Sequence, residues 1–353
     1  MFSLPSREDD AAVAAFKTHL NYLEAFNHLL NQDSSDSSGT MLDRIYDRIN
    51  RSGVCNAVKR NDIDVAALKR SLSHAWGIER LLYANQEATS DDSLLRLANN
   101  WSCIQAYYVL YHATQTLQIA KGQKRPESHT ATQKTFVNLW STRGINLAPW
   151  SFVYSPDHPM VIPAGVVIDE NIHNFTHCDE MSSWSLCFKA LRTTRNESLP
   201  EAFKNKRIEK QKCQKLNWQK EETARLSAGK RPRLPRKFPL PHLTGEEKRA
   251  VDGKIRPYSL MDYLYRLRIK VNYQDADMFV DGPASNDQSI KAYTFLCNLA
   301  SATLFLSELS IIPIWGKTKF SEYYKEWHKS KTSTLSSPGL GNRGLLLDAH
   351  CAR

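Results

Sequence analysis

The stretch that decides the fold is PYSLMDYLYRLRIKVNYQDADMFVDG, which runs from Pro257 to Gly282. Its aliphatic residues recur at the three- to four-residue spacing that places side chains on one face of an α-helix. We therefore expect an amphipathic helix that packs one face against a core. That apolar face consists of Leu260, Leu264, Leu267 and Val271.

Polar residues follow a second face of the same predicted helix. Arg268, Asn272 and Asp275 stand at positions i, i+4 and i+7, and Tyr273 lies beside them. An arginine on a largely buried helix is costly unless it is paired or used. These four residues are therefore candidates for a catalytic site. The alternative interpretation is an ordinary Arg–Asp pair on a solvated helix face.

A second stretch, WSCIQAYYVLYHATQTLQIAKG from Trp101 to Gly122, carries apolar and aromatic residues almost all round a helix. This pattern predicts a central, buried helix. Tyr108 and His112 are i, i+4 neighbours on it, so His112 is a candidate member of a polar cluster facing Arg268. The alternative, and the commoner fate of such residues, is that they edge the core and form local hydrogen bonds.

Together, the pattern YYxxYHAxxxL…G…P…H…F and the later R-x3-Asn-Tyr-x-Asp resemble the HEPN superfamily of helical bundles, and most closely its uncharacterised bacterial branch. The resemblance covers residues 66–142 and 257–310. It implies an antiparallel helical bundle, a homodimer with the motif at its interface, and metal-independent RNA cleavage by an Arg-x4–6-His motif.

The chain departs from that motif at its histidine. The position five after Arg268 is Tyr273, and no histidine follows until His328. A tyrosine with a pKa near 10 is a poor base at neutral pH. His129 resembles the histidine at the corresponding helix start of the family, where the role is structural.

The predicted fold class is mainly α, with a HEPN-like antiparallel helical bundle, a loop and short-strand insertion, and a basic helical arm. The bundle is expected to form from two separate parts of the chain. The predicted regions are 1–63, an N-terminal helical extension; 64–142, the first part of the bundle; 143–200, an irregular insertion; 201–256, a basic helix and Pro-rich linker; 257–316, the second part of the bundle; and 317–353, a C-terminal helix and mobile tail.

The composition is that of an ordinary globular protein of 353 residues, with 41% hydrophobic and 24% charged residues. Seven scattered cysteines without a Cys-x2-Cys pair favour a reducing environment over disulfides. The N-terminus is too acidic for a secretory signal, and no uninterrupted apolar run approaches a membrane span. We therefore expect a cytoplasmic protein without a membrane partner. Phosphate-binding Gly-rich motifs are absent, so we expect no cofactor.

One segment supplies the whole net charge of +10. Between Lys204 and Lys237, thirteen Lys or Arg residues stand against three Glu residues. Concentrated positive charge attracts polyanions, most often nucleic acid, and the resemblance to HEPN proteins implies RNA rather than DNA. The alternative is a solvated surface helix and linker. The candidate contacts are Lys204, Arg207, Lys210, Lys215, Trp218, Lys220, Arg231 and Arg233, with Trp218 stacking on a base.

The irregular insertion contains a histidine and cysteine run, His173, His177 and Cys178. His-x3-His-Cys could bring ligands together on a helix, but a tetrahedral site needs a further pair at recognisable spacing. We therefore predict no metal site.

Two hypotheses from different classes follow. The first is an RNA-directed HEPN-type ribonuclease, a toxin or phage-defence effector, whose basic arm holds RNA. The second is a non-catalytic HEPN-like module that binds nucleic acid or a partner protein. The missing histidine favours the second, and the basic arm suits both. The first hypothesis assigns catalytic roles to Arg268, Asn272, Tyr273, Asp275 and His112. In the second hypothesis the same residues form a structural polar network.

Overall fold

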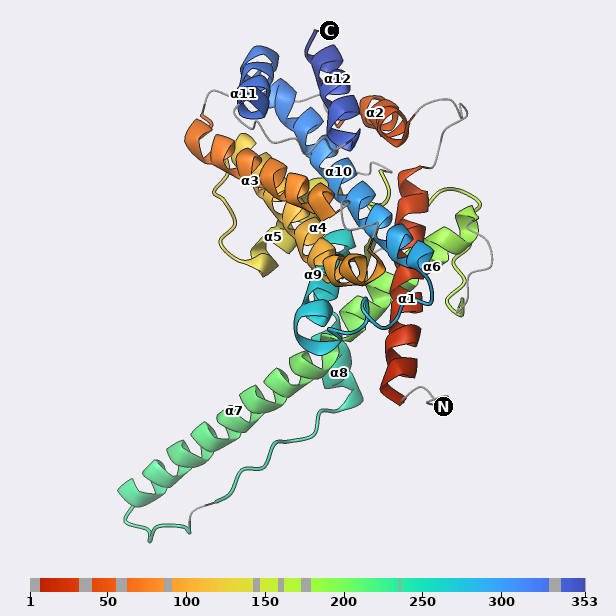
Figure 1. Cartoon of the computed structure of the whole chain (residues 1–353). Coiled ribbons are helices and arrows are strands. Elements are labelled where there is room, and N and C mark those ends of the chain that lie inside the picture. The colour runs from red at the N-terminus through yellow and green to blue at the C-terminus, as the bar shows by residue number, and fades with distance from the viewer. Residues whose placement is uncertain are drawn as a thin grey trace, which may run out of the picture.

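Helix α10 (Asn286–Trp315) runs through the centre of the helical bundle (Figure 1). It packs against α4 (Asp92–Ala120) and α1 (Arg7–Leu30), and its side chains are buried on almost every face beyond Ala292. It is also the one helix in the described part of the chain that is long and apolar enough to cross a membrane, although 89% of its most apolar window is buried inside the protein. A core helix passes the same test, so the expectation of no membrane partner stays a prediction.

The computed structural model confirms a mainly helical fold. It describes residues 7–31, 40–54, 62–85, 91–141, 147–157, 162–172, 179–234, 236–329 and 338–352. The remaining elements are α2 (Met41–Ser52), α3 (Val65–Ala84), α5 (His129–Trp140), β1 (Val153–Tyr154), α6 (Glu180–Asn196), α7 (Leu199–Ser227), α8 (Gly245–Asp252), β2 (Tyr258–Ser259), α9 (Leu260–Ile269), a π-helix (Lys270–Gln274), α11 (Lys317–Lys329) and α12 (Pro338–Ala352).

Capping side chains fix the starts of several helices. The Asp64 side chain accepts a hydrogen bond from the amide of Ala67 at 3.0 Å, and Ser128 accepts one from Ala131 at 3.1 Å. Such caps satisfy amide groups that lack a partner within the helix. The second cap matters for the site, because it begins α5 at His129.

The two regions predicted as an extension and as an irregular insertion each contribute a core helix. Helix α1 packs against α6 and α10, and Phe16 and Phe26 on it are fully buried. The insertion has no proline between Pro163 and Pro200, which lies in the first turn of α7, so no proline breaks α6. The short strand predicted in the insertion exists as β1, but it pairs antiparallel with β2 rather than within a local hairpin.

The end of the chain also differs from the prediction. The segment from Ser330 was expected to be mobile, yet α12 is helical and its Arg343 is fully buried. The guanidinium of Arg343 is bonded to the carboxylate of Glu79 on α3 and forms an ion pair with Glu308 on α10. This buried charge cluster anchors α12 to the bundle, which a Ser- and Gly-rich local sequence does not reveal.

The basic segment forms an arm that projects from the bundle (Figure 1). Helix α7 leads outward, residues 229–234 and 236–244 return beside it without helix, and α8 closes the loop at its base. Only Glu222 of α7 is buried. Helix α7 and the Pro-rich chain that returns from it lie side by side.

Candidate functional site

Arg268 lies on the last turn of α9 inside a group of tyrosine rings. Its Cζ atom is 5.3 Å from the ring centroid of Tyr108 and 5.5 Å from those of Tyr107 and Tyr265. Its Nε and Nη1 atoms are buried and have no hydrogen-bond partner among the described residues. No carboxylate of the described chain pairs with Arg268. Its charge is therefore stabilised by the cation–π contacts with the three rings. The N–H groups of these two nitrogen atoms therefore have no acceptor among the described residues.

His129 belongs to the same cluster of rings. Its Nδ1 atom is 2.6 Å from the hydroxyl oxygen of Tyr107, and its ring centroid is 5.4 Å from that of Tyr265. Burial and the nearby charge of Arg268 lower the pKa of His129, so the ring is neutral at pH 7. Burial raises the pKa of Tyr107, whose hydroxyl therefore keeps its proton and can donate it to Nδ1. That arrangement leaves the ring proton of His129 on Nε2.

His112 lies beside these rings but contacts α3 rather than Arg268. Its ring centroid is 5.2 Å from that of His74 and 5.3 Å from that of Tyr111. Burial, with the charges of His74 and Arg125, lowers the pKa of His112 to about 4. The predicted cluster across the bundle therefore forms around His129, and His112 edges the core.

The other catalytic candidates do not share a face with Arg268. The helix changes to a π-helix at Lys270, where the amide of Asp275 donates to the carbonyl of Lys270 at 2.8 Å. This i→i+5 bond adds a residue to the turn and rotates the following side chains. Asn272 and Tyr273 are exposed, and Asp275 pairs with Lys270 at 3.6 Å. The predicted i, i+4, i+7 face assumed a straight α-helix and is wrong.

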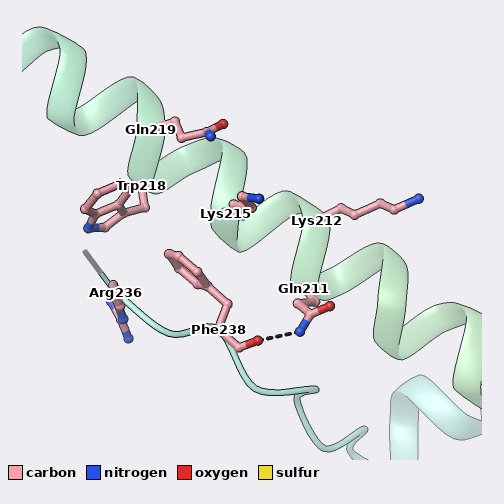
Figure 2. Close-up of a pocket in the computed structure, with 7 residues that line it drawn as sticks. All are labelled: Gln211, Lys212, Lys215, Trp218, Gln219, Arg236 and Phe238. Atoms are coloured by element: carbon pink, nitrogen blue, oxygen red, sulfur yellow. Dashed lines mark hydrogen bonds between the residues drawn. The ribbon is translucent and has the colours of Figure 1, made fainter.

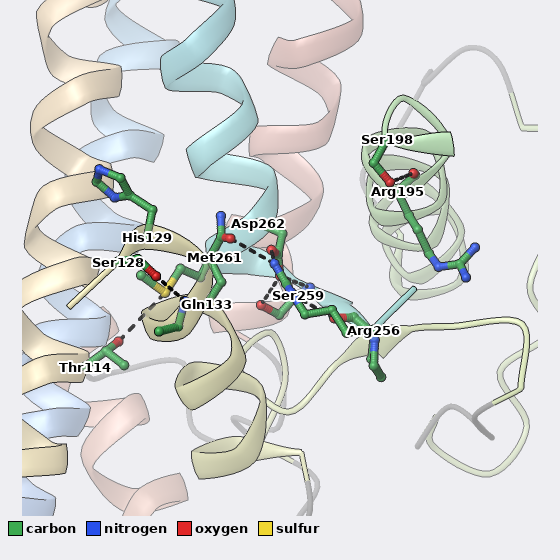
Figure 3. Close-up of polar contacts among 12 residues, drawn as sticks. Thr114, Ser128, His129, Gln133, Arg195, Ser198, Arg256, Ser259, Met261 and Asp262 are labelled. Carbon is green, nitrogen blue, oxygen red and sulfur yellow. Dashed lines mark hydrogen bonds and ion pairs between the residues drawn. The ribbon is translucent and has the colours of Figure 1, made fainter. Parts of the chain in front are cut away.

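A polar network at the start of α9 sets the position of α5 (Figure 3). The Asp262 carboxylate accepts hydrogen bonds from the amide and hydroxyl groups of Ser259, both at 2.9 Å, and from Arg256 at 3.0 Å. Arg256 also donates to Oε1 of Gln133 on α5 at 2.9 Å. Since His129 lies one turn before Gln133, this network also holds His129 near Arg268.

The arm carries a groove between α7 and the returning chain (Figure 2). Its cavity volume is about 560 Å³. The rings of Trp218 and Phe238 point into it with their centroids 6.1 Å apart. We call it the arm groove; its lining residues are Gln211, Lys212, Lys215, Trp218, Gln219, Arg236 and Phe238.

Some of the predicted contacts on the arm are occupied with holding it together. Lys210 pairs with Glu247 at 2.6 Å, and Arg233 with Glu222 at 2.6 Å. Arg207 donates to the carbonyl of Pro241 at 3.0 Å. Lys204 forms only a long, exposed pair with Glu201, at 3.8 Å.

A second set of arm cations has no ion pair with any described residue. Two of them, Lys212 and Arg236, were not among the predicted contacts, and neither was Phe238. The sequence signal for Phe238 is that it is the one Phe, Tyr or Trp between Gly229 and Thr244. The set includes Lys212, Lys215, Lys220, Arg231 and Arg236.

Metal ligands are not clustered in the described part of the chain, where no group of three His, Cys, Asp or Glu residues could hold an ion. The run of His173, His177 and Cys178 lies outside the described residues. Neither a protein-family model, nor a curated protein, nor a solved structure matches this chain.

Proposed function

We propose that this protein binds single-stranded RNA along its arm. The observation that carries the proposal is the arm groove, in which two aromatic rings lie among cations that no carboxylate neutralises. Sites for single strands combine such rings, on which bases stack, with positive charge that follows the phosphates. Trp218 and Phe238 supply the stacking surfaces, and Lys212, Lys215 and Arg236 contact the backbone.

An unpaired strand suits this groove better than a duplex. Bases in a duplex already stack on one another, so their faces are not free to contact Trp218. The preference for RNA over DNA rests on the HEPN resemblance.

Fluorescence anisotropy with a labelled 12-nucleotide RNA tests this proposal. Because stacking on an aromatic ring contributes about 1–3 kcal/mol per base, Trp218→Ala should weaken binding roughly 5- to 150-fold. Leu216→Ala is the matched control, since Leu216 is exposed on the same helix and does not line the groove. Equal affinity of the Trp218 variant and the wild type would refute the proposal.

A second candidate function is metal-independent RNA cleavage at Arg268 and His129. The supporting observation is the pair of unbonded N–H groups of Arg268 beside a neutral imidazole. In this mechanism Arg268 binds the scissile phosphate and stabilises its extra negative charge in the transition state. The 2′-hydroxyl attacks phosphorus and gives its proton to solvent, the bond from phosphorus to the 5′-oxygen breaks, and His129 donates its Nε2 proton to that oxygen and recovers a proton from solvent. His129 thus takes the place of the histidine missing from the motif.

Incubation of tRNA with the protein in EDTA tests this second function. We expect cleavage by the wild type and by Tyr273→Phe, and loss of cleavage in Arg268→Met and His129→Asn. Expression of the wild type should then slow growth, as a toxin or defence effector would, and the two inactive variants should not. RNA that stays intact but shifts on a gel would instead support the non-catalytic binding module.

The homodimer implied by the resemblance is also a proposal. An apolar stripe supports it: Leu94, Leu97 and Trp101 of α4 are 51%, 53% and 64% exposed and stand at helical spacing. Sedimentation velocity of the wild type and Trp101→Glu tests it, and we expect the variant alone to be monomeric. A monomeric wild type would refute it and leave a partner protein as the alternative occupant.

A further inference from the structure

A second cavity lies in the bundle, between α5, the junction of α6 with α7, and α9. Its volume is about 280 Å³, near the lower end of small-ligand pockets. It is separate from the arm groove and shares only Tyr265 with the ring cluster around Arg268. Its lining includes Thr130, Gln133, Arg256, Tyr258 and Tyr265.

The charges at this cavity are already neutralised. Arg256 is paired with Asp262, and Arg266 is paired with Glu197. The cavity therefore has no unpaired cation for a phosphate. It suits a neutral group that is planar and polar.

Hydrogen-bonding groups of this cavity remain available. Gln133 is only 4% exposed and its Oε1 accepts from Arg256, while its amide nitrogen keeps contact with solvent and has no hydrogen-bond partner in the described ranges. The hydroxyl groups of Tyr258 and Tyr265 are likewise without a hydrogen bond there. The amide of Gln133 can therefore donate to a ligand in the cavity. Two phenol rings beside it offer stacking surfaces.

The position of Tyr265 joins this cavity to Arg268. Its ring lines the cavity and also lies 5.5 Å from the Arg268 Cζ atom and 5.4 Å from the His129 ring. Thr130, at the cavity edge, directly follows His129. A single aromatic ring therefore separates a neutral polar cavity from an unpaired guanidinium.

We propose that this cavity binds one nucleobase, that of a nucleotide whose phosphate lies against Arg268. Gln133 donates to an acceptor on the edge of the base, and Tyr258 and Tyr265 contact its faces. The proposal rests on RNA being the ligand of the protein. It adds a base-reading site, distinct from the sequence-tolerant stacking in the arm groove.

Isothermal titration of the full-length protein with the four nucleosides and their 3′-monophosphates tests this. We expect at least one nucleotide to bind. Gln133→Leu should weaken the binding of the nucleoside and of the nucleotide by 10-fold or more. Arg268→Met should weaken the binding of the nucleotide and leave the binding of the nucleoside unchanged. Tyr258→Phe keeps the ring and should weaken the binding of both ligands about 3-fold. This conservative variant tests the cavity even if the Gln133 variant misfolds. Leu216→Ala, outside both this cavity and the arm groove, should change neither.

Two results would overturn the proposal. One is the absence of binding by any nucleoside or nucleotide while the 12-nucleotide RNA still binds, an outcome that leaves RNA binding by the arm intact. The other is nucleotide binding that the Gln133 and Tyr258 variants do not change. Loss of oligonucleotide binding in Trp218→Ala with nucleotide binding retained would support both sites independently.

Discussion

Two arginines of the bundle, Arg343 and Arg268, are withdrawn from solvent in opposite ways. Arg343 is fully buried, bonded to Glu79 at 2.6 Å and paired with Glu308 at 3.1 Å. Arg268 is half-buried among tyrosine rings, with two N–H groups unbonded. A cation satisfied by carboxylates stabilises the fold, whereas one held by rings alone keeps its donors for a ligand.

The Arg343 cluster has its own electrostatic consequence. Two carboxylates, those of Glu79 and Glu308, share one guanidinium, and all three side chains are fully buried. Burial raises the pKa of Glu308 to about 7, even though the charge of Arg343 acts in the opposite direction. The stability of this end of the bundle should therefore depend on pH near neutrality.

The largest expected effect is on stability, from Arg343→Met. Removal of the guanidinium leaves buried carboxylates unpaired, which costs about 3–5 kcal/mol of the free energy of unfolding. The matched change Arg268→Met removes only cation–π contacts and should cost about 1 kcal/mol. Chemical denaturation followed by circular dichroism compares the two, and equal losses would contradict the distinction.

A smaller effect is expected from the titration of Glu308. Its folded-state pKa lies above the unfolded value of 4.5, so the stability it contributes is present below pH 4.5 and is lost as pH rises through 7. Between pH 5 and pH 8 the wild type should therefore lose about 2–3 kcal/mol relative to Glu308→Gln, which cannot ionise. Denaturation of both proteins across this range provides the measurement. Parallel pH profiles would show that Glu308 does not titrate there.

The smallest effect is expected at Tyr273, which is 72% exposed on the π-helix. Tyr273→Phe should change the free energy of unfolding by less than about 0.5 kcal/mol and leave RNA cleavage unchanged. Tyr107→Phe is the sharper comparison, because it removes the hydroxyl beside Nδ1 of His129 and should reduce cleavage. Reduced RNA cleavage by the Tyr273 variant would show that Tyr273 belongs to the catalytic site.

Sequence patterns predict the local parts of this account and miss the non-local ones. The spacing of apolar residues and the caps at Asp64 and Ser128 are encoded within a turn or two, so the helices they begin are predictable. The π-helix after Ile269 shifts the register by one residue, which a 3.6-residue period does not reveal. Arg343 meets Glu79 across 264 positions in the chain, and only tertiary packing makes that pair.

The candidate site shows the same division. Arg268 was identified because a charge on a buried helix requires an explanation. Its cluster with His129 forms because the chain turns between α4 and α5 and because Arg256 ties Gln133 to the start of α9. On the arm, charge density predicted a binding surface, but the pairing of Lys210 and Arg233 with carboxylates decides which cations are free.

The salt dependence of RNA binding tests the central claim, that unpaired cations bind the ligand, most directly. Lys212→Ala with Lys215→Ala and Lys206→Ala with Lys210→Ala remove the same charge from one helix, but Lys206 and Lys210 are paired with Glu209 and Glu247 at 2.9 and 2.6 Å. We expect the first double variant to reduce the slope of log affinity against log salt by about 1.4, at roughly 0.7 per phosphate contact, and the second to leave it nearly unchanged. Equal reductions in both would show that overall charge alone, and not the arm groove, attracts RNA.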